Sequence, residues 1–201
     1  MNNILKSISF IFHPILMPML GVIFYFSKSP RYIPIEIIQA KVLSLFILTV
    51  LLPILLYFLL KTMGKTSTIY LSTAKERITP LILNCIIVTL IILRVLPSTE
   101  IIELHYFFVG ILFSNLSCLI LAILKFKASI HMTAVAGVFM FYVALSIHFS
   151  ININGTLALM AILIGAIATS RLHMEAHNSK ELIIGFIIGF IPQLILVNYW
   201  L

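Results

Sequence analysis

Long apolar runs separated by short polar segments make up almost the whole chain. Seven runs approach the length of about 20 apolar residues that a helix needs to cross a hydrocarbon layer about 30 Å thick. They cover residues 9–26, 42–60, 80–97, 103–124, 130–149, 155–170 and 181–200. Their length and the lack of strict alternation favour spanning helices over barrel strands. The pattern predicts an all-α integral membrane protein, a bundle of six to seven transmembrane helices.

The polar connections leave no room for a second domain. The longest of them are residues 27–41 and 61–79, so we expect residues 1–201 to form a single transmembrane domain. The first run contains His13, Pro14 and Pro18, and no small-residue cleavage site follows it. It is therefore interpreted as a retained, bent helix rather than a signal peptide.

Composition supports a membrane location. The chain is 62% hydrophobic with a mean hydropathy of +1.19, whereas soluble domains are roughly half apolar. The net charge of +7 comes from cations beside the apolar runs, so the expected partners are anionic membrane lipids rather than nucleic acid. All six acids are glutamate, which excludes any mechanism that uses an aspartyl nucleophile.

Three polar clusters are expected on the same side of the membrane. If all seven runs cross, the segments 61–79, 125–129 and 171–180 lie on one face together with the N-terminus. The clusters are residues 75–80, 125–131 and 170–181, and each lies at the mouth of a helix. Their side chains are expected to meet in one cavity at the membrane surface.

The distribution of basic residues favours a cytoplasmic position for that face. It has nine Lys and Arg (Lys6, Lys61, Lys65, Lys75, Arg77, Lys125, Lys127, Arg171 and Lys180), against four on the other face (Lys28, Arg31, Lys41 and Arg94). Cytoplasmic loops are enriched in Lys and Arg. The sequence thus predicts a multi-pass protein of the cell (inner) membrane with the clusters facing the cytoplasm.

The third cluster contains a candidate histidine–carboxylate pair. His177 and Glu181 are four residues apart, so on one helix face the carboxylate can reach a ring nitrogen. It would fix the tautomer and make the other nitrogen a better nucleophile or base. Gly185 and Gly189 continue this face and allow close approach of a neighbouring helix.

The other clusters supply candidate anion ligands. Ser129 precedes His131 at the start of a helix, where backbone amides and the helix dipole favour an anion. Arg77 and Arg171 offer planar, bidentate donors that suit phosphate, and Lys75 can add an ammonium group. Together these residue types indicate phosphoryl transfer through histidine.

The same residues resemble the type 2 phosphatidic acid phosphatase superfamily. Ser170-Arg171, five residues, His177, three residues and Glu181 is similar to its third signature, Ser-Arg, five residues, His, three residues, Asp. Ala128-Ser129-Ile130-His131 resembles the second, Pro-Ser-Gly-His, and residues 75–80 occupy the place of the first, Lys, six residues, Arg-Pro. Tyr70 stands where that signature begins with Lys, so its arginine, Arg77, is the residue that carries over.

The resemblance implies a phosphatase core and a role in phospholipid metabolism. The substrate would be a lipid phosphate or a polyprenyl pyrophosphate. His177 would be the nucleophile, Glu181 would orient it, and His131 would be the general acid and base. Arg77, Arg171 and Ser129, with Lys75, would bind phosphate. The family needs no metal or other cofactor.

Two alternatives use the same residues differently. His173, Glu175, His177 and His131 could bind a metal ion in a membrane hydrolase or oxygenase. Alternatively, the cations could only hold an anionic head group in a carrier or lipid-binding protein. The in-register His177 and Glu181 disfavour the second alternative, because binding alone does not require an oriented histidine.

Overall fold

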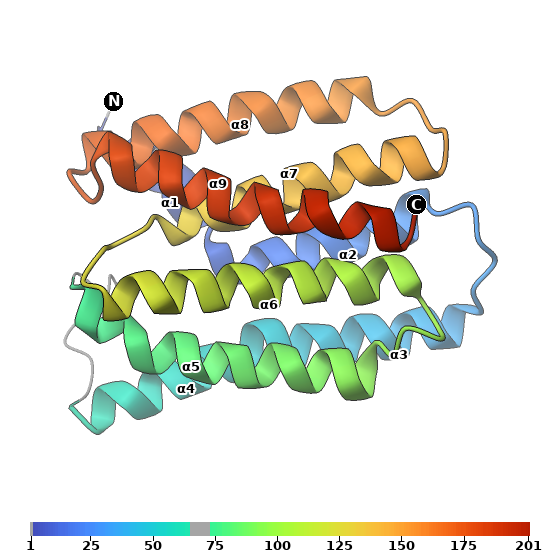
Figure 1. Cartoon of the computed structure of the whole chain (residues 1–201), viewed down its shortest axis with the longest axis horizontal. Helices are drawn as coiled ribbons and strands as arrows, with labels where there is room; N and C mark the ends of the chain where they lie inside the picture. The colour runs from blue at the N-terminus through green and yellow to red at the C-terminus, as the bar shows by residue number, and fades with distance from the viewer. Residues whose placement is uncertain (1, 65–72) are drawn as a thin grey trace.

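The computed structural model describes residues 2–64 and 73–201, which form helices and short connections without a strand (Figure 1). The elements are α1 (Asn2–Ile11), η1 (Pro14–Leu16), α2 (Met17–Lys28), α3 (Ile35–Phe46), η2 (Ile47–Leu51), α4 (Leu52–Thr62), α5 (Ala74–Leu90), η3 (Ile91–Val95), α6 (Ile102–Ile123), α7 (Ile130–His148), α8 (Asn154–His173), α9 (Ser179–Leu196) and η4 (Val197–Tyr199). η1 and η4 are 3-10 turns, whereas η2 and η3 are π-helical turns.

These elements join into seven helices that are long and apolar enough to cross a membrane. They are Ser7–Lys28, Ile35–Thr62, Ala74–Val95, Ile102–Ile123, Ile130–His148, Asn154–His173 and Ser179–Tyr199. Each predicted run overlaps one of them and extends at most two residues beyond its end. The expected all-helical class is confirmed, with seven membrane-length helices in the described part of the chain, as in a multi-pass membrane protein.

Two helices begin about two turns before the predicted apolar runs. The second long helix begins at Ile35 rather than at residue 42, and the third begins at Ala74 rather than at residue 80. Both starts contain charged residues, which lower the hydropathy but are tolerated where a helix end reaches the head groups. Arg77 consequently lies on a helix and not in a loop.

The predicted bend in the first helix is confirmed at His13. The α1 helix ends at Ile11, and the chain resumes with the short turn η1, whose first residue is Pro14. The Nδ1 atom of His13 accepts a hydrogen bond from Ile15 N–H at 3.3 Å. The imidazole thereby caps the turn after the break.

Helix α7 is the centre of the bundle. Within the membrane-length windows, 61% of α7 is buried, whereas the other six helices are 17% to 33% buried. The outer helices expose many Ile and Leu side chains, for example Leu55 on α4 and Ile162 on α8, which suits contact with lipid tails. Residues on α7 therefore contact protein on nearly every side.

The packing of α9 on α7 depends on two glycines, as the sequence predicts. A Cβ atom on Gly185 would lie 2.6 Å from Ser129 O, and one on Gly189 would lie 2.0 Å from Thr133 O. The hydroxyl of Thr133 also donates to Gly185 O at 3.0 Å. The backbones of the two helices thus touch directly, which only residues without a side chain permit.

The three polar clusters share one end of the bundle, as expected (Figure 1). The segments 124–129 and 174–178 lie there, together with the starts of α1 and α5. The segments 29–34, 97–101 and 149–153 lie at the opposite end with the C-terminus. Lys65 and Tyr70 lie outside the described residues. Which end faces the cytoplasm stays a prediction from the basic residues.

A buried carboxylate holds the opposite end together. Glu103 is fully buried, and its carboxylate lies 2.6 Å from an Nη atom of Arg31. It also accepts a hydrogen bond from Tyr25 Oη at 3.1 Å and contacts His148 Nε2 at 3.2 Å. Since a buried carboxylate needs such partners, this cluster ties α2, α6 and the end of α7 to one another.

Replacement of Gly189 tests the α7–α9 contact. We expect Gly189→Ala to lower the free energy of unfolding by about 1–3 kcal/mol, because the added methyl group overlaps the Thr133 backbone. Gly165→Ala is the matched control, since a Cβ there meets nothing within 4 Å, and alanine favours the helix. Thermal unfolding in detergent measures both; equal melting temperatures would contradict the contact.

Candidate active site

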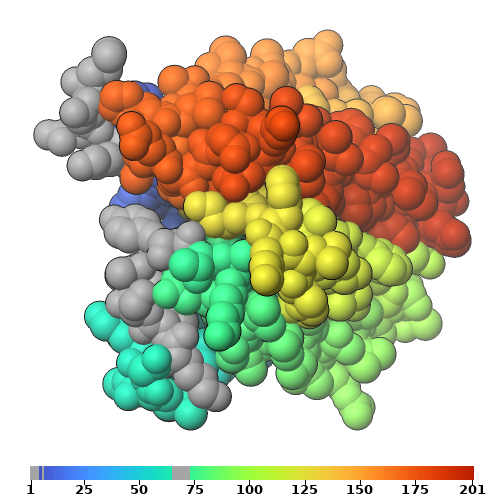
Figure 2. All heavy atoms as spheres, turned by 60° about the vertical axis from the view of Figure 1, so that its left-hand side comes forward, coloured from blue at the N-terminus to red at the C-terminus, as the bar shows by residue number. Residues whose placement is uncertain are grey.

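The three polar clusters meet where α5, α7 and α9 begin and α8 ends. Figure 2 looks onto this end of the bundle, where the segment before α7 (yellow) lies between the start of α5 (green) and the α8–α9 connection (orange). Arg77 Nη1 donates to Ala128 O at 2.7 Å, and Ser129 N–H donates to Glu181 O at 3.0 Å. These two bonds hold the middle cluster between the other two.

His177 and Glu181 make the contact that their spacing predicts. Nδ1 of His177 lies 2.7 Å from Oε2 of Glu181, and His177 is 6% exposed. A carboxylate only accepts hydrogen bonds, so in the neutral ring Nδ1 carries the proton and Nε2 keeps its lone pair. The ring is thus oriented with Nε2 as the nitrogen whose lone pair is available.

This contact arises from a helix cap and not from a shared helix face. His177 precedes α9, which begins at Ser179. The Asn178 side chain accepts from Glu181 N–H at 3.0 Å, and Glu181 Oε2 accepts from Asn178 N–H at 3.3 Å. The oxygen that accepts the hydrogen bond from His177 therefore also closes a capping box. The helix cap thus holds Glu181 in place.

Arg77 and Lys75 point to different sides of α5. Arg77 is 6% exposed and reaches the segment before α7, whereas Lys75 is exposed. Residues two positions apart on a helix do not share a face. The structure does not bring Lys75 to the other site residues, contrary to its expected part in phosphate binding.

Arg171 supplies the second buried guanidinium group. It lies in the last turn of α8 and is also 6% exposed. Its charge acts on the rings of His131 and His177 and on Arg77, so these groups lie within electrostatic range of one another. Two guanidinium groups with the single carboxylate of Glu181 give the site a positive interior, which attracts anions.

Ser129 has a different environment from the expected one. It is the fully buried N-cap of α7, and its own N–H is used by Glu181 O. This amide is therefore not available to a ligand, although the first amides within α7 lack intrahelical acceptors, as at any helix start. The buried Oγ of Ser129 has no hydrogen-bond partner among the described residues, so a bound oxyanion would be its first.

His131 contacts the N-terminal segment. Its Nε2 lies 3.2 Å from the carbonyl oxygen of Ser9. A carbonyl only accepts, so Nε2 carries a proton and Nδ1 is the basic nitrogen of the neutral ring. The Ser9 hydroxyl in turn lies 2.6 Å from Ser170 Oγ. The residue before Arg171 thus anchors α1 beside the site, a contact without a sequence signal.

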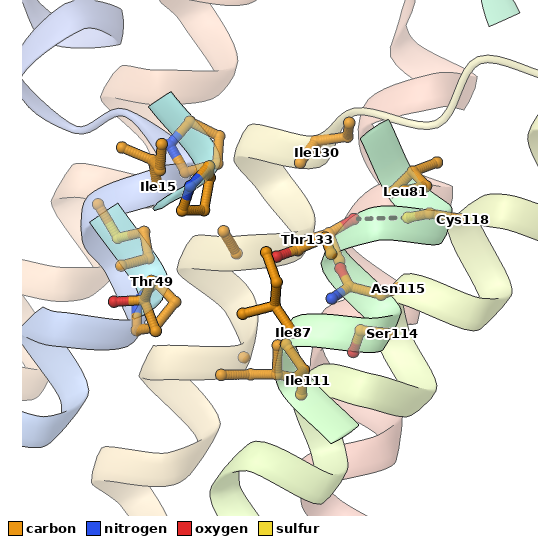
Figure 3. A pocket seen from close by; sticks show the side chains of 18 of the residues that line it. Ile15, Thr49, Leu81, Ile87, Ile111, Ser114, Asn115, Cys118, Ile130 and Thr133 are labelled. Atoms are coloured by element: carbon orange, nitrogen blue, oxygen red, sulfur yellow. Dashed lines mark hydrogen bonds between the residues drawn. The ribbon is translucent and has the colours of Figure 1, made fainter. Parts of the chain in front are cut away.

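A cavity of about 230 Å³ lies within the bundle, and Arg77 is the site residue that lines it. Its lining includes the basic side chains of Arg77 and His13. It also includes Phe107 on α6 and Gln193 on α9. Figure 3 shows its wall, where apolar side chains such as Ile87 alternate with a few polar ones. The cavity therefore offers an apolar space next to a positively charged one.

The metal-binding alternative lacks a suitable geometry. His173 and Glu175 are exposed, whereas His177 is buried. Across residues 2–64 and 73–201, no three His, Cys or Glu side chains form a group that could hold a metal ion. The four residues proposed as ligands from the sequence are thus not assembled.

The fold and the site define a multi-pass helical membrane protein with a buried cluster of histidines and arginines at one end of its bundle. Comparison of the chain with family models, with curated proteins and with solved structures gives no match. Its function is therefore inferred from the chemistry of the residues at this site.

The titration of His177 tests this electrostatic environment. Burial lowers the pKa of His177 below its usual 6.5; the Glu181 hydrogen bond raises it, and the charges of Arg77 and Arg171 lower it further. Below pH 6.5 the unfolded chain then binds more protons than the folded protein. The stability that His177 contributes is present above pH 6.5 and falls as the pH drops from 6.5 toward the folded pKa.

NMR of the ¹⁵N-histidine-labelled protein measures this titration, and His177→Gln identifies the resonance. Arg171→Gln should raise the pKa toward 6.5, whereas Glu181→Gln should lower it further, because each removes a charge of opposite sign. A midpoint at or above 6.5 in the unsubstituted protein would contradict the buried position of the ring.

Proposed function

We propose that the protein is an integral membrane phosphatase of the type 2 phosphatidic acid phosphatase kind. It hydrolyses a lipid phosphate or an isoprenoid pyrophosphate through a phosphohistidine intermediate. The observation that carries this proposal is the 2.7 Å contact between His177 Nδ1 and Glu181 Oε2 beside two buried arginines. A carrier that only holds an anionic head group has no use for an imidazole oriented in this way.

In the first step, the Nε2 lone pair of His177 attacks phosphorus. A P–N bond forms, and the P–O bond to the leaving group breaks. The leaving oxygen takes a proton from His131, which acts as the imidazolium. Because Nε2 of His131 donates to Ser9 O, Nδ1 is the nitrogen that gives up this proton. Glu181 stabilises the positive charge that develops on the His177 ring.

In the second step, water attacks the phosphohistidine. His131 Nδ1 takes a proton from this water, the P–N bond breaks, and inorganic phosphate leaves. Arg77 and Arg171 neutralise the phosphate oxygens in both steps, and their guanidinium planes suit bidentate contacts. The site ends the cycle with neutral His177 and protonated His131.

The cavity supports a substrate with an apolar chain. It begins at Arg77 and continues between helices that lie within the membrane-length part of the bundle. A lipid phosphate can place its phosphate at the two arginines and its chain in the cavity, so the apolar part avoids water. A soluble phosphate ester would leave this space without an apolar partner.

Phosphate release by the detergent-purified protein tests this function. Suitable substrates are phosphatidic acid, phosphatidylglycerol phosphate and a polyprenyl pyrophosphate, each with EDTA present. We expect release that EDTA does not affect and that falls by at least about a hundredfold in His177→Ala, because the nucleophile is lost. His173→Ala is the matched control, since this exposed histidine should be dispensable.

A second readout identifies the intermediate. Rapid acid-free quenching with a ³²P-labelled substrate should leave alkali-stable label on His177, which His177→Ala lacks. Release that persists in His177→Ala would contradict the mechanism. No release from any of these lipids by the folded protein would favour the carrier alternative.

The two basic residues on α5 give a separate prediction. We expect Arg77→Gln to lower kcat/KM by about 10- to 1000-fold, because it removes the buried positive charge that would contact the phosphate. Lys75→Gln removes the same charge two residues away, on the exposed side of the helix, and should change kcat/KM by less than about twofold. Steady-state kinetics compares them. An equal loss in both variants would indicate a general surface-charge effect.

A further inference from the structure

His13 lies next to the proposed site, although the mechanism above does not use it. Its ring packs edge-to-face on the ring of His131, with the centroids 5.6 Å apart. It lines the cavity together with Arg77, and the charge of Arg171 acts on it as well. His13 therefore lines the cavity beside Arg77 and contacts His131, a residue of the proposed site.

The hydrogen bonding of His13 fixes its tautomer. Ile15 N–H donates to Nδ1 at 3.3 Å, so Nδ1 is the acceptor, and the neutral ring carries its proton on Nε2. No hydrogen bond to this Nε2 is present in residues 2–64 and 73–201. His131 differs, because its Nε2–H is already used by Ser9 O. Of the two adjacent rings, His13 has the donor that is not committed to the backbone.

We propose that His13 is a phosphate-binding residue of this site, whose Nε2–H donates to a phosphate oxygen of the substrate where the cavity reaches Arg77. This inference rests on the proposed function. The phosphate would then have three donors: His13 at the start of η1, Arg77 on α5 and Arg171 on α8. These lie on separate elements of the bundle, and a phosphate has enough oxygens to accept from all of them.

The break between α1 and α2 orients the His13 ring. His13 precedes Pro14 and has an extended backbone, as a residue before proline favours. The cap holds the His13 ring by its Nδ1 atom, so the ring is oriented before the substrate arrives. A donor fixed in this way loses little conformational entropy when it binds phosphate.

Two substitutions separate the cap from the donor. His13→Asn keeps an acceptor at the δ position, and asparagine is among the best N-cap residues, but its side chain is too short to replace Nε2. His13→Gln places an amide nitrogen at the ε position and loses the favourable cap. The two variants thus remove the proposed donor and the structural contact one at a time.

Binding of inorganic phosphate is measured from the phosphate-dependent rise in melting temperature in detergent. We expect His13→Asn to keep the melting temperature measured without phosphate and to bind phosphate about tenfold more weakly, as loss of one hydrogen bond to a charged group implies. His13→Gln should melt earlier and keep its phosphate Kd within about threefold. The KM for phosphatidic acid should follow the phosphate Kd.

The opposite pattern would overturn the proposal. If His13→Asn binds phosphate and phosphatidic acid like the unsubstituted protein, His13 is only a cap. If His13→Asn weakens phosphate binding while no lipid is hydrolysed, the His13 site stands and the phosphatase proposal fails. If the unsubstituted protein binds no phosphate at millimolar concentration, both proposals fail.

Discussion

The direct contact between the α7 and α9 backbones is the constraint on which the rest of the site depends. Gly185 and Gly189 bring α9 against Ser129 and Thr133 so closely that any side chain would overlap the carbonyl oxygens. The start of α7 and the start of α9 consequently lie side by side. His131 comes from one and Glu181 from the other, and the Ser129–Glu181 backbone bond holds the two starts together. A looser pair of helices would separate the histidines.

Charge is concentrated at the two ends of this bundle and satisfied differently at each. At one end the carboxylate of Glu103 is fully buried and contacts the side chains of Arg31, Tyr25 and His148, so it is surrounded by donors. At the other end two guanidinium groups accompany one carboxylate. Burial of charge is costly unless it is compensated. The first end thus surrounds a carboxylate with donors, whereas the second gathers the two arginines and the histidines on which the proposed phosphate site is based.

Spacing in the sequence predicted the contact between His177 and Glu181 but gave the wrong cause for it. The four-residue spacing indicated a shared helix face, whereas the structure has a capping box in which Asn178 holds the carboxylate. The expectation for Lys75 failed for a related reason. The sequence alone did not show that α5 begins at Ala74. It therefore did not show that Lys75 and Arg77 lie on different faces of a helix. Helix boundaries therefore decide which cation reaches a site.

The sequence by itself determined the seven apolar helices, the end of the bundle at which the polar clusters lie, and the close approach at Gly185 and Gly189. These properties can be read along the chain, because they depend on the length of each apolar run, on the number of membrane crossings before a polar segment, and on the absence of a side chain at glycine. Only the tertiary structure decided that His13 and Ser9 lie beside His131. Such contacts join residues far apart in sequence, and no periodicity relates them, so packing alone brings them together.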